Sequence, residues 1–186
     1  MAISEVGATP QPEHNNDSIR KLHDEKTAKS IFNSLNKDGN CVIDENDGVD
    51  RSMLSALKKF VGNTLTLENL KRVAGKISDF IYTKADKYNG KDAQITYDFW
   101  GHILSVNTGA QNVSEARTHM GLDKEYIVGC NTGDIITYGR EYEKNNGTQK
   151  DYFVWNPETK SMDFEWGVWS AKNDNNFVWY NPTTWF

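Results

Sequence analysis

Apolar residues recur with a helical period through about the first 110 residues of the chain. Spacings of three and four residues predict amphipathic helices around 28–35, 49–61 and 67–81, with a shorter one starting at Thr96. A further short helix is expected over 112–120, "NVSEARTHM". The residues that the first four helices would turn inward are Ala28, Ile31, Phe32 and Leu35; Val49, Met53, Leu54, Leu57, Phe60 and Val61; Leu67, Leu70, Val73, Ala74, Ile77, Phe80 and Ile81; and Phe99, Ile103 and Leu104.

After about residue 122 the apolar period changes to two. The segment 161–169, "SMDFEWGVW", alternates large apolar residues with other residues, which predicts a β-strand. The side chains expected on one face of this strand are Met162, Phe164, Trp166 and Val168. Turn-forming clusters at 144–149 and 156–160 join neighbouring strands as antiparallel pairs, and 177–186 is a candidate closing strand. A meander of four or five strands is therefore expected.

Together these patterns predict an α+β protein. The expected organisation is a disordered leader at 1–17, a helical region at 18–108, and a short helix followed by an antiparallel, tryptophan-rich sheet at 109–186. At 186 residues neither part is clearly self-sufficient, so the helices and the sheet could share one core.

Composition limits the partners and the location of the chain. A formal net charge of −5 and a pI near 5.4 disfavour binding to nucleic acid or to an anionic membrane, and favour cations. No signal peptide or transmembrane segment is recognisable, which predicts a soluble protein, either cytoplasmic or secreted without a leader. Cys41 and Cys130 have no metal-ligand spacing, and a single disulfide between them stays open.

An acidic loop separates the first two predicted helices. The stretch 32–47, "FNSLNKDGNCVIDEND", places carboxylate and amide side chains at alternate positions around one glycine. A hard divalent ion takes about six to eight oxygen ligands, and alternate residues of a tightly wound loop can converge on one centre. Helix, acidic loop and helix in this order resemble an EF-hand, whose twelve-residue calcium loop supplies oxygens from positions 1, 3, 5, 7, 9 and 12.

The resemblance implies a calcium site on residues 36–47, with Mg²⁺ as an alternative ion. The ligands that it implies are Asn36, Asp38, Asn40, the carbonyl of Val42, Asp44 and Asp47. It also places Ile43 at position 8, where the family forms a short strand pair with a partner loop. A polar turn that caps the next helix is the alternative for this segment.

Three positions depart from the family pattern and predict weak binding. Asn36 replaces an aspartate, Asp47 replaces a longer glutamate, and Cys41 stands where the family has a glycine with positive φ. A non-glycine residue in that conformation costs on the order of 1–3 kcal/mol. Affinity in the micromolar range or weaker is expected. The partner loop is predicted around 86–98 as a pseudo-loop with Ile95 at position 8.

Five of the six tryptophans lie in the last 32 residues. One face of the predicted sheet must form the core, and the other could expose an aromatic platform that stacks on sugar rings or holds a partner protein. The residues predicted to bind such a glycan or protein are Trp155, Trp169 and Trp179. The alternative is a small domain that fills its own core with large side chains.

The function expected from the sequence is calcium binding, with the ion bracing or regulating an aromatic-rich interaction domain. A rival from another class is a glycan- or protein-recognition module with a vestigial metal loop. The four histidines share no metal-binding spacing, and no glycine-rich phosphate loop precedes a helix. The sequence therefore favours a protein that is not an enzyme.

Overall fold

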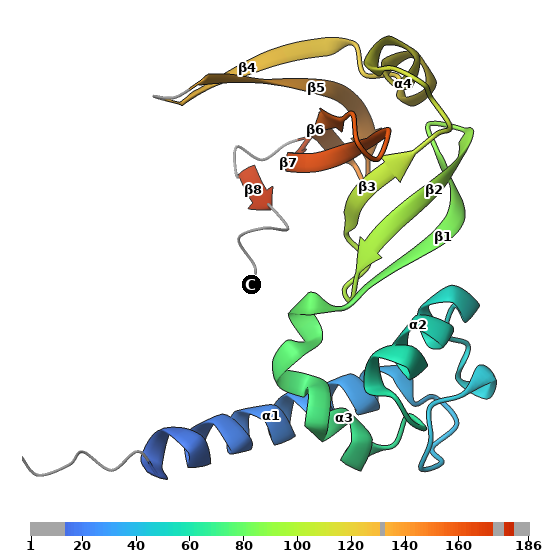
Figure 1. The fold of residues 1–186 in the computed structure, drawn as a ribbon, viewed down its shortest axis with the longest axis vertical. Helices are drawn as coiled ribbons and strands as arrows, with labels where there is room; N and C mark the ends of the chain where they lie inside the picture. The colour runs from blue at the N-terminus through green and yellow to red at the C-terminus, as the bar shows by residue number, and fades with distance from the viewer. Residues whose placement is uncertain (1–13, 131–132, 173–176, 181–186) are drawn as a thin grey trace, which may run out of the picture. The chain divides into compact units, whose positions relative to one another are not determined.

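The structure is a computed structural model, in which the chain divides into two compact units (Figure 1). The residues that it describes are 14–130, 133–172 and 177–180. The residues grouped in the first unit are 1–50 and 57–76, and those grouped in the second are 51–56 and 77–186. Helices come first and a sheet follows, so the predicted α+β class is confirmed. Among the described residues, no helix is both long and apolar enough to cross a membrane.

The helical elements follow the predicted apolar stripes. They are α1 (His14–Leu35), the 3₁₀-helix η1 (Glu45–Asp47), α2 (Arg51–Val61), α3 (Leu67–Val73) and the 3₁₀-helix η2 (Ala74–Asp79). Ala28, Ile31 and Leu70 are buried, as their positions in the stripes require. Because α1 begins at His14, residues 14–17 of the predicted leader are helical, and residues 1–13 lie outside the described residues.

The predicted helix from Thr96 is wrong. That segment falls in β2 (Lys91–Asp98) and β3 (Ile103–Asn107), which follow β1 (Ile81–Tyr88) in an antiparallel arrangement. Asn89 and Gly90 join β1 to β2 with φ values of 52° and 73°, as a two-residue hairpin turn requires. The helical region predicted at 18–108 therefore ends at Asp79, because strand pairing overrides the helical spacing of the apolar residues beyond it.

The predicted meander is confirmed, and the first three strands extend it. Its strands are β4 (Lys124–Cys130), β5 (Gly133–Lys144), β6 (Gly147–Asn156), β7 (Ser161–Ala171) and β8 (Phe177–Tyr180). Within the described residues all strands belong to one antiparallel sheet of order β1-β2-β3-β7-β6-β5-β4, with β8 also paired to β7 (Figure 1). The pairing of β3 with β7 joins the early hairpin to the meander.

Helix α4 (Val113–Met120) packs on the core of the second unit, which contains the sheet and is called the sheet unit below. Asn112 accepts a hydrogen bond from the Glu115 N–H at 2.9 Å and caps the helix, and Gly121 ends it with φ of 66°. Met120 lies in one buried cluster with residues from five strands and the connecting loops. The other members are Tyr88, Ala93, Ile95, Val106, Ala110, Ala116, Leu122, Phe153, Met162 and Phe164.

A β-bulge divides the aromatic residues of β7 between the two faces of the sheet. Tyr152 pairs with Trp166, but the next residue, Phe153, pairs with Phe164, which leaves Glu165 as an extra residue. Phe164 packs edge-on against Phe153 with ring centroids 5.5 Å apart. Trp166 stacks on Tyr152 at 4.0 Å, on the opposite face. The prediction that Phe164 and Trp166 share one face is therefore wrong, because the extra residue shifts the alternation.

Truncation of Met120 tests this core. Met120 is fully buried, with 0% of its surface exposed, so Met120→Ala is expected to lower the free energy of unfolding by about 2–5 kcal/mol through lost burial and the cavity left behind. Urea denaturation measures the change. Ser114→Ala on the exposed side of the same helix is the control, and an equally large loss there would contradict the packing described for α4.

Candidate metal centre

Short-range hydrogen bonds wind the loop between α1 and η1. Asp38 Oδ1 accepts from the Asn40 N–H at 3.0 Å, and Asn40 Oδ1 accepts from the Val42 N–H at 2.9 Å. Asp44 Oδ1 accepts from the Asn46 N–H at 2.9 Å and caps η1. Each bond reaches two residues ahead, which is the pattern by which aspartate and asparagine stabilise turns.

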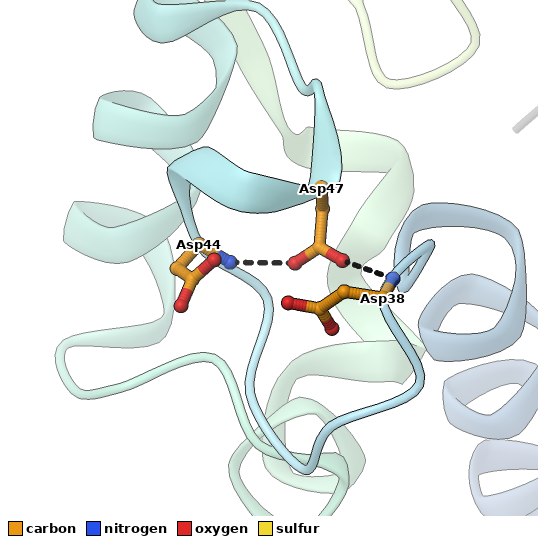
Figure 2. A group of neighbouring side chains, drawn as sticks. All are labelled: Asp38, Asp44 and Asp47. Atoms are coloured by element: carbon orange, nitrogen blue, oxygen red, sulfur yellow. Dashed lines mark hydrogen bonds between the residues drawn. The ribbon is translucent and has the colours of Figure 1, made fainter.

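Asp47 ties the two ends of the loop together. Its Oδ1 accepts from the N–H groups of Lys37 at 2.7 Å and Asp38 at 3.2 Å, and its Oδ2 accepts from the Asp44 N–H at 2.8 Å. Figure 2 shows the carboxylate lying between the backbone nitrogens of Asp38 and Asp44. Only 4% of the residue is exposed. The hydrogen bond from Asp44 is the main cause that holds the pKa of Asp47 below its usual 3.8, against desolvation, which raises it.

Three carboxylates converge in this loop. One oxygen from each of Asp38, Asp44 and Asp47 can be chosen so that all three lie within 4.8 Å of one another (Figure 2). Asp38 is exposed, Asp44 is half-buried and Asp47 is buried. Like charges at this spacing repel, and a cation between them would convert the repulsion into attraction. Each carboxylate oxygen has two lone pairs. Asp47 Oδ1 uses both for the N–H groups of Lys37 and Asp38, whereas Asp47 Oδ2 accepts from the Asp44 N–H and retains capacity for an ion.

Asn36 adds a buried oxygen with unmet bonding capacity. Its Nδ2 donates to the carbonyl of Asn40 at 2.8 Å, whereas its Oδ1 is buried with no hydrogen-bond partner among the described residues. A buried acceptor left in this way costs about 1–3 kcal/mol. Of the other predicted ligands, Asn40 already uses its Oδ1 to hold the Val42 N–H, so its first role is to shape the loop.

The strain predicted at Cys41 does not arise. The residue with positive φ is Gly39, at 76°, and Cys41 is absent from the positive-φ residues of the described chain. The residue with left-handed backbone conformation is therefore at position 4 of the loop, whereas the EF-hand resemblance predicts it at position 6. Cys41 is an exposed, free thiol, and the side chain of Cys130 lies outside the described residues.

The partner of Ile43 is not where the sequence placed it. The Ile43 N–H donates to the carbonyl of Leu65 at 3.0 Å, and both residues are buried. Leu65 lies in the short connection between α2 and α3, whereas the predicted partner loop at 86–98 forms the end of β1, the hairpin turn and β2. The sequence signal for this partner is Leu65, a single apolar residue between Thr64 and Thr66 just before a helix.

The three tryptophans predicted to bind a ligand have different surroundings. Trp169 lines a cavity in the sheet unit, and Trp155 packs partly buried against the core cluster. Trp179 belongs to β8, but its side chain lies outside the described part of the chain. Sequence reasoning missed the aromatic cluster that Tyr126 forms with Tyr152 and Trp166, because the bulge in β7 was not visible in the alternation.

Comparison of the chain with protein-family models, with curated proteins and with solved structures gives no match. The functional assignment therefore depends on the geometry of the residues themselves.

Asp47→Asn tests whether a charged carboxylate holds the loop together. Asparagine offers one acceptor oxygen and a donor NH₂ group, so at least one backbone N–H would face another donor. A lower thermal midpoint is expected at pH 7, measured by calorimetry. Asp38→Asn removes the same charge from an exposed position and is the control. Equal midpoints for the two variants would contradict the anchoring role of Asp47.

Comparison of the wild type with Asp47→Asn also tests a pH dependence of stability. Folding lowers the pKa of Asp47, so the stability that its charge contributes is complete above the unfolded value of 3.8 and is lost as pH falls through the lower folded pKa. The difference in thermal midpoint between the wild type and Asp47→Asn is therefore expected to be constant near neutral pH and to shrink below pH 3.8. A difference that grows on acidification would rule out this linkage.

Proposed function

We propose that the loop at 36–47 binds a hard divalent cation, and that calcium is its preferred ion. The observation that carries the proposal is the convergence of Asp38, Asp44 and Asp47, whose oxygens lie within 4.8 Å of one another. Asn36, the first residue of the same loop, supports it independently, because its buried Oδ1 has no hydrogen-bond partner in the part of the chain that the structure describes. The EF-hand resemblance supports the same ion.

The chemistry of the donors favours calcium over softer metals. The cluster offers carboxylate oxygens, with an amide oxygen nearby in the sequence, and these suit calcium and magnesium. Calcium tolerates irregular coordination by about six to eight oxygens, whereas magnesium demands near-octahedral geometry and keeps much of its water. A loop whose oxygens already serve backbone hydrogen bonds fits the more tolerant ion better.

The same hydrogen bonds limit affinity. Both oxygens of Asp47 accept backbone N–H groups, so bidentate coordination by Asp47 competes with the contacts that fold the loop. The affinity is therefore expected to be micromolar or weaker. A bound ion would link the residue after α1 to η1 and act as a brace, stabilising the fold by about 2.7 kcal/mol at a concentration of 100 times Kd.

Calorimetric titration with calcium and with magnesium tests the proposal. The protein is first stripped of metal with a chelator, and its thermal midpoint is measured with and without each ion. We expect saturable binding of calcium with a raised midpoint, and weaker binding of magnesium, because three carboxylates would share the ion. The double variant Asp38→Asn with Asp44→Asn is expected to lose both effects.

Glu45→Gln is the matched control. Glu45 is adjacent to Asp44 and carries the same charge, but it is not part of the cluster. Its Oε1 instead lies 3.8 Å from Nζ of Lys58. Its substitution should leave calcium binding nearly intact. The proposal fails if no heat and no midpoint shift appear up to about 10 mM calcium, which exceeds the range of weak EF-hand sites. It fails equally if Glu45→Gln weakens binding as much as the double variant.

A further inference from the structure

Strand β1 forms one edge of the sheet (Figure 1). It pairs with β2 on one side, and no strand of the described chain lies on its other side. Ile81, Thr83, Ala85 and Lys87 are exposed along it. A strand edge presents backbone N–H and C=O groups with which another strand can pair. At eight residues, β1 is long enough for such pairing.

The hairpin turn determines which residues of β1 direct their backbone groups outward. Asn89 and Gly90 both have positive φ, so the residues that flank them, Tyr88 and Lys91, form a hydrogen-bonded pair. Hydrogen-bonded and non-hydrogen-bonded pairs alternate along an antiparallel ladder. The backbone groups of the even-numbered residues of β1 therefore point to β2, and those of the odd-numbered residues point away from it.

Side-chain contacts across the ladder support this assignment. Side chains lie closer together in the non-hydrogen-bonded pairs of an antiparallel ladder. Thr83 and Thr96 form such a pair, and their Oγ1 atoms are 2.8 Å apart. In another such pair, Lys87 Nζ donates to Asp92 Oδ1 at 2.9 Å. The backbone groups of Thr83, Ala85 and Lys87 are therefore the ones at the outer edge of the sheet.

The charges of β1 are self-complementary about Ala85. If two copies pair antiparallel with a two-fold axis at Ala85, Thr83 of one copy is opposite Lys87 of the other. Lys84 is then opposite Asp86 of the second copy, in a non-hydrogen-bonded pair whose side chains lie close together. Within one copy, Lys84 Nζ is already 3.9 Å from Asp86 Oδ2. The four charges around the axis would therefore alternate in sign.

Other two-fold registers are less favourable. Outward-pointing backbone groups must meet each other, which requires an axis that passes through a residue of the strand. An axis at Lys84, Asp86 or Lys87 would place that residue opposite its own like charge, which is destabilising. An axis at Thr83 would pair a shorter stretch and form no ion pair. Charge complementarity therefore selects the axis at Ala85, and a second copy of this chain as the partner.

Asp86 places its charge at the outer edge of the strand. Its Oδ1 accepts from the Lys87 N–H, which points away from β2, at 2.8 Å, and its Oδ2 accepts from the Tyr97 hydroxyl at 2.6 Å. The bond from Tyr97 is the main cause that holds the pKa of Asp86 below its usual 3.8, so the carboxylate is charged at neutral pH. Pairing of two copies would exchange this acceptor of the Lys87 N–H for the Thr83 carbonyl of the second copy, which limits affinity.

We propose that β1 pairs antiparallel with β1 of a second copy of the chain, about a two-fold axis at Ala85, so that the two sheets join into one. The contact consists of about six backbone hydrogen bonds and two pairs of opposite charge. It is smaller than a standard interface of about 1,600 Å², so the dimer is weak, with Kd in the micromolar range. This inference goes beyond the proposed cation site and does not depend on it, since no residue of the acidic cluster belongs to β1.

Sedimentation velocity of the full chain tests the proposal. The protein is studied with a chelator present, at about 0.15 M salt, where charges more than about 8 Å apart are largely screened. A reversible dimer is expected to form as concentration rises from about 1 to 500 µM. Lys84→Glu and Asp86→Lys each place like charges opposite each other across the axis, and each is expected to raise Kd about tenfold or more.

An equimolar mixture of these two variants tests the register. Lys84→Glu in one copy then faces Asp86→Lys in the other, and the remaining Asp86 faces the remaining Lys84. Dimers are therefore expected to return in the mixture, although each variant alone is monomeric at the same concentration. Changes within one chain cannot produce this rescue. Lys87→Glu makes the same change of charge opposite the neutral Thr83, and is the control that should leave Kd nearly unchanged.

Ala85→Pro tests the backbone pairing and remains informative if a charge variant does not fold. Proline removes the N–H at the axis, and an edge strand tolerates proline where that N–H faces solvent. Loss of the dimer with retention of the fold, checked by near-UV circular dichroism, is expected. Ala85→Ser keeps the N–H and is the matched control, with Kd unchanged.

The proposal is overturned if the folded wild type stays monomeric throughout this concentration range. It is also overturned if folded Ala85→Pro dimerises as the wild type does, which would place the contact elsewhere on the molecule. A mixture of the two charge variants that stays monomeric rules out the register at Ala85, as does a loss for Lys87→Glu as large as that for Lys84→Glu.

Discussion

Side chains alternate between the two faces of a β-strand, and in β7 one extra residue, Glu165, reverses that alternation midway. Before the bulge, Phe164 faces the core with Phe153. An uninterrupted strand would place Trp169, five residues later, on the opposite face from Phe164. The bulge brings both residues to the same cavity and leaves Trp166 on the other side, stacked on Tyr152. The aromatic residues that line the cavity and the cluster of Tyr126, Tyr152 and Trp166 therefore have one common cause, since both depend on a single unpaired position in the β6–β7 ladder.

Two glycines allow these aromatic rings to lie flat across neighbouring strands. A Cβ at Gly139 would lie 2.5 Å from the ring of Tyr152, and one at Gly147 would lie 2.5 Å from Cε2 of Trp169. Such distances leave no room for a Cβ atom, so each aromatic ring packs directly against the backbone of a glycine. Glycine normally weakens a strand, because it loses more conformational entropy on folding than other residues and has no side chain to pack. Here the covering ring supplies the missing packing and is itself held in one orientation. The fixed orientation of Tyr152 and Trp169 thus comes from the packing of each ring against a glycine on the neighbouring strand.

Local signals predicted much of the fold, and interactions between distant residues explain what they missed. The stripes through Ala28 and Leu70 gave the helices, because a helix buries one face regardless of its partner. The alternation within β5 to β7 gave the meander. The segment at 86–98 was misinterpreted as a pseudo-loop, because Ile95 was aligned with position 8 of a calcium loop, although "NG" at 89–90 is a strong hairpin signal. The cavity could not be predicted, because its residues come from separate strands and connections whose register depends on the bulge.

Asp47 and Asp151 are two buried aspartates whose carboxylates accept hydrogen bonds from different kinds of donor. Backbone N–H groups hold the charge of Asp47, and the nearest titratable groups of its cluster, Asp38 and Asp44, carry charge of the same sign. Additional negative charge is costly there, so a divalent cation would gain from all three. Asp151 instead accepts hydrogen bonds from the side chains of Tyr142 and Gln149, and Arg140 lies opposite it in the ladder. The same residue type thus ties together the two ends of a loop at Asp47 and side chains of β5 and β6 at Asp151.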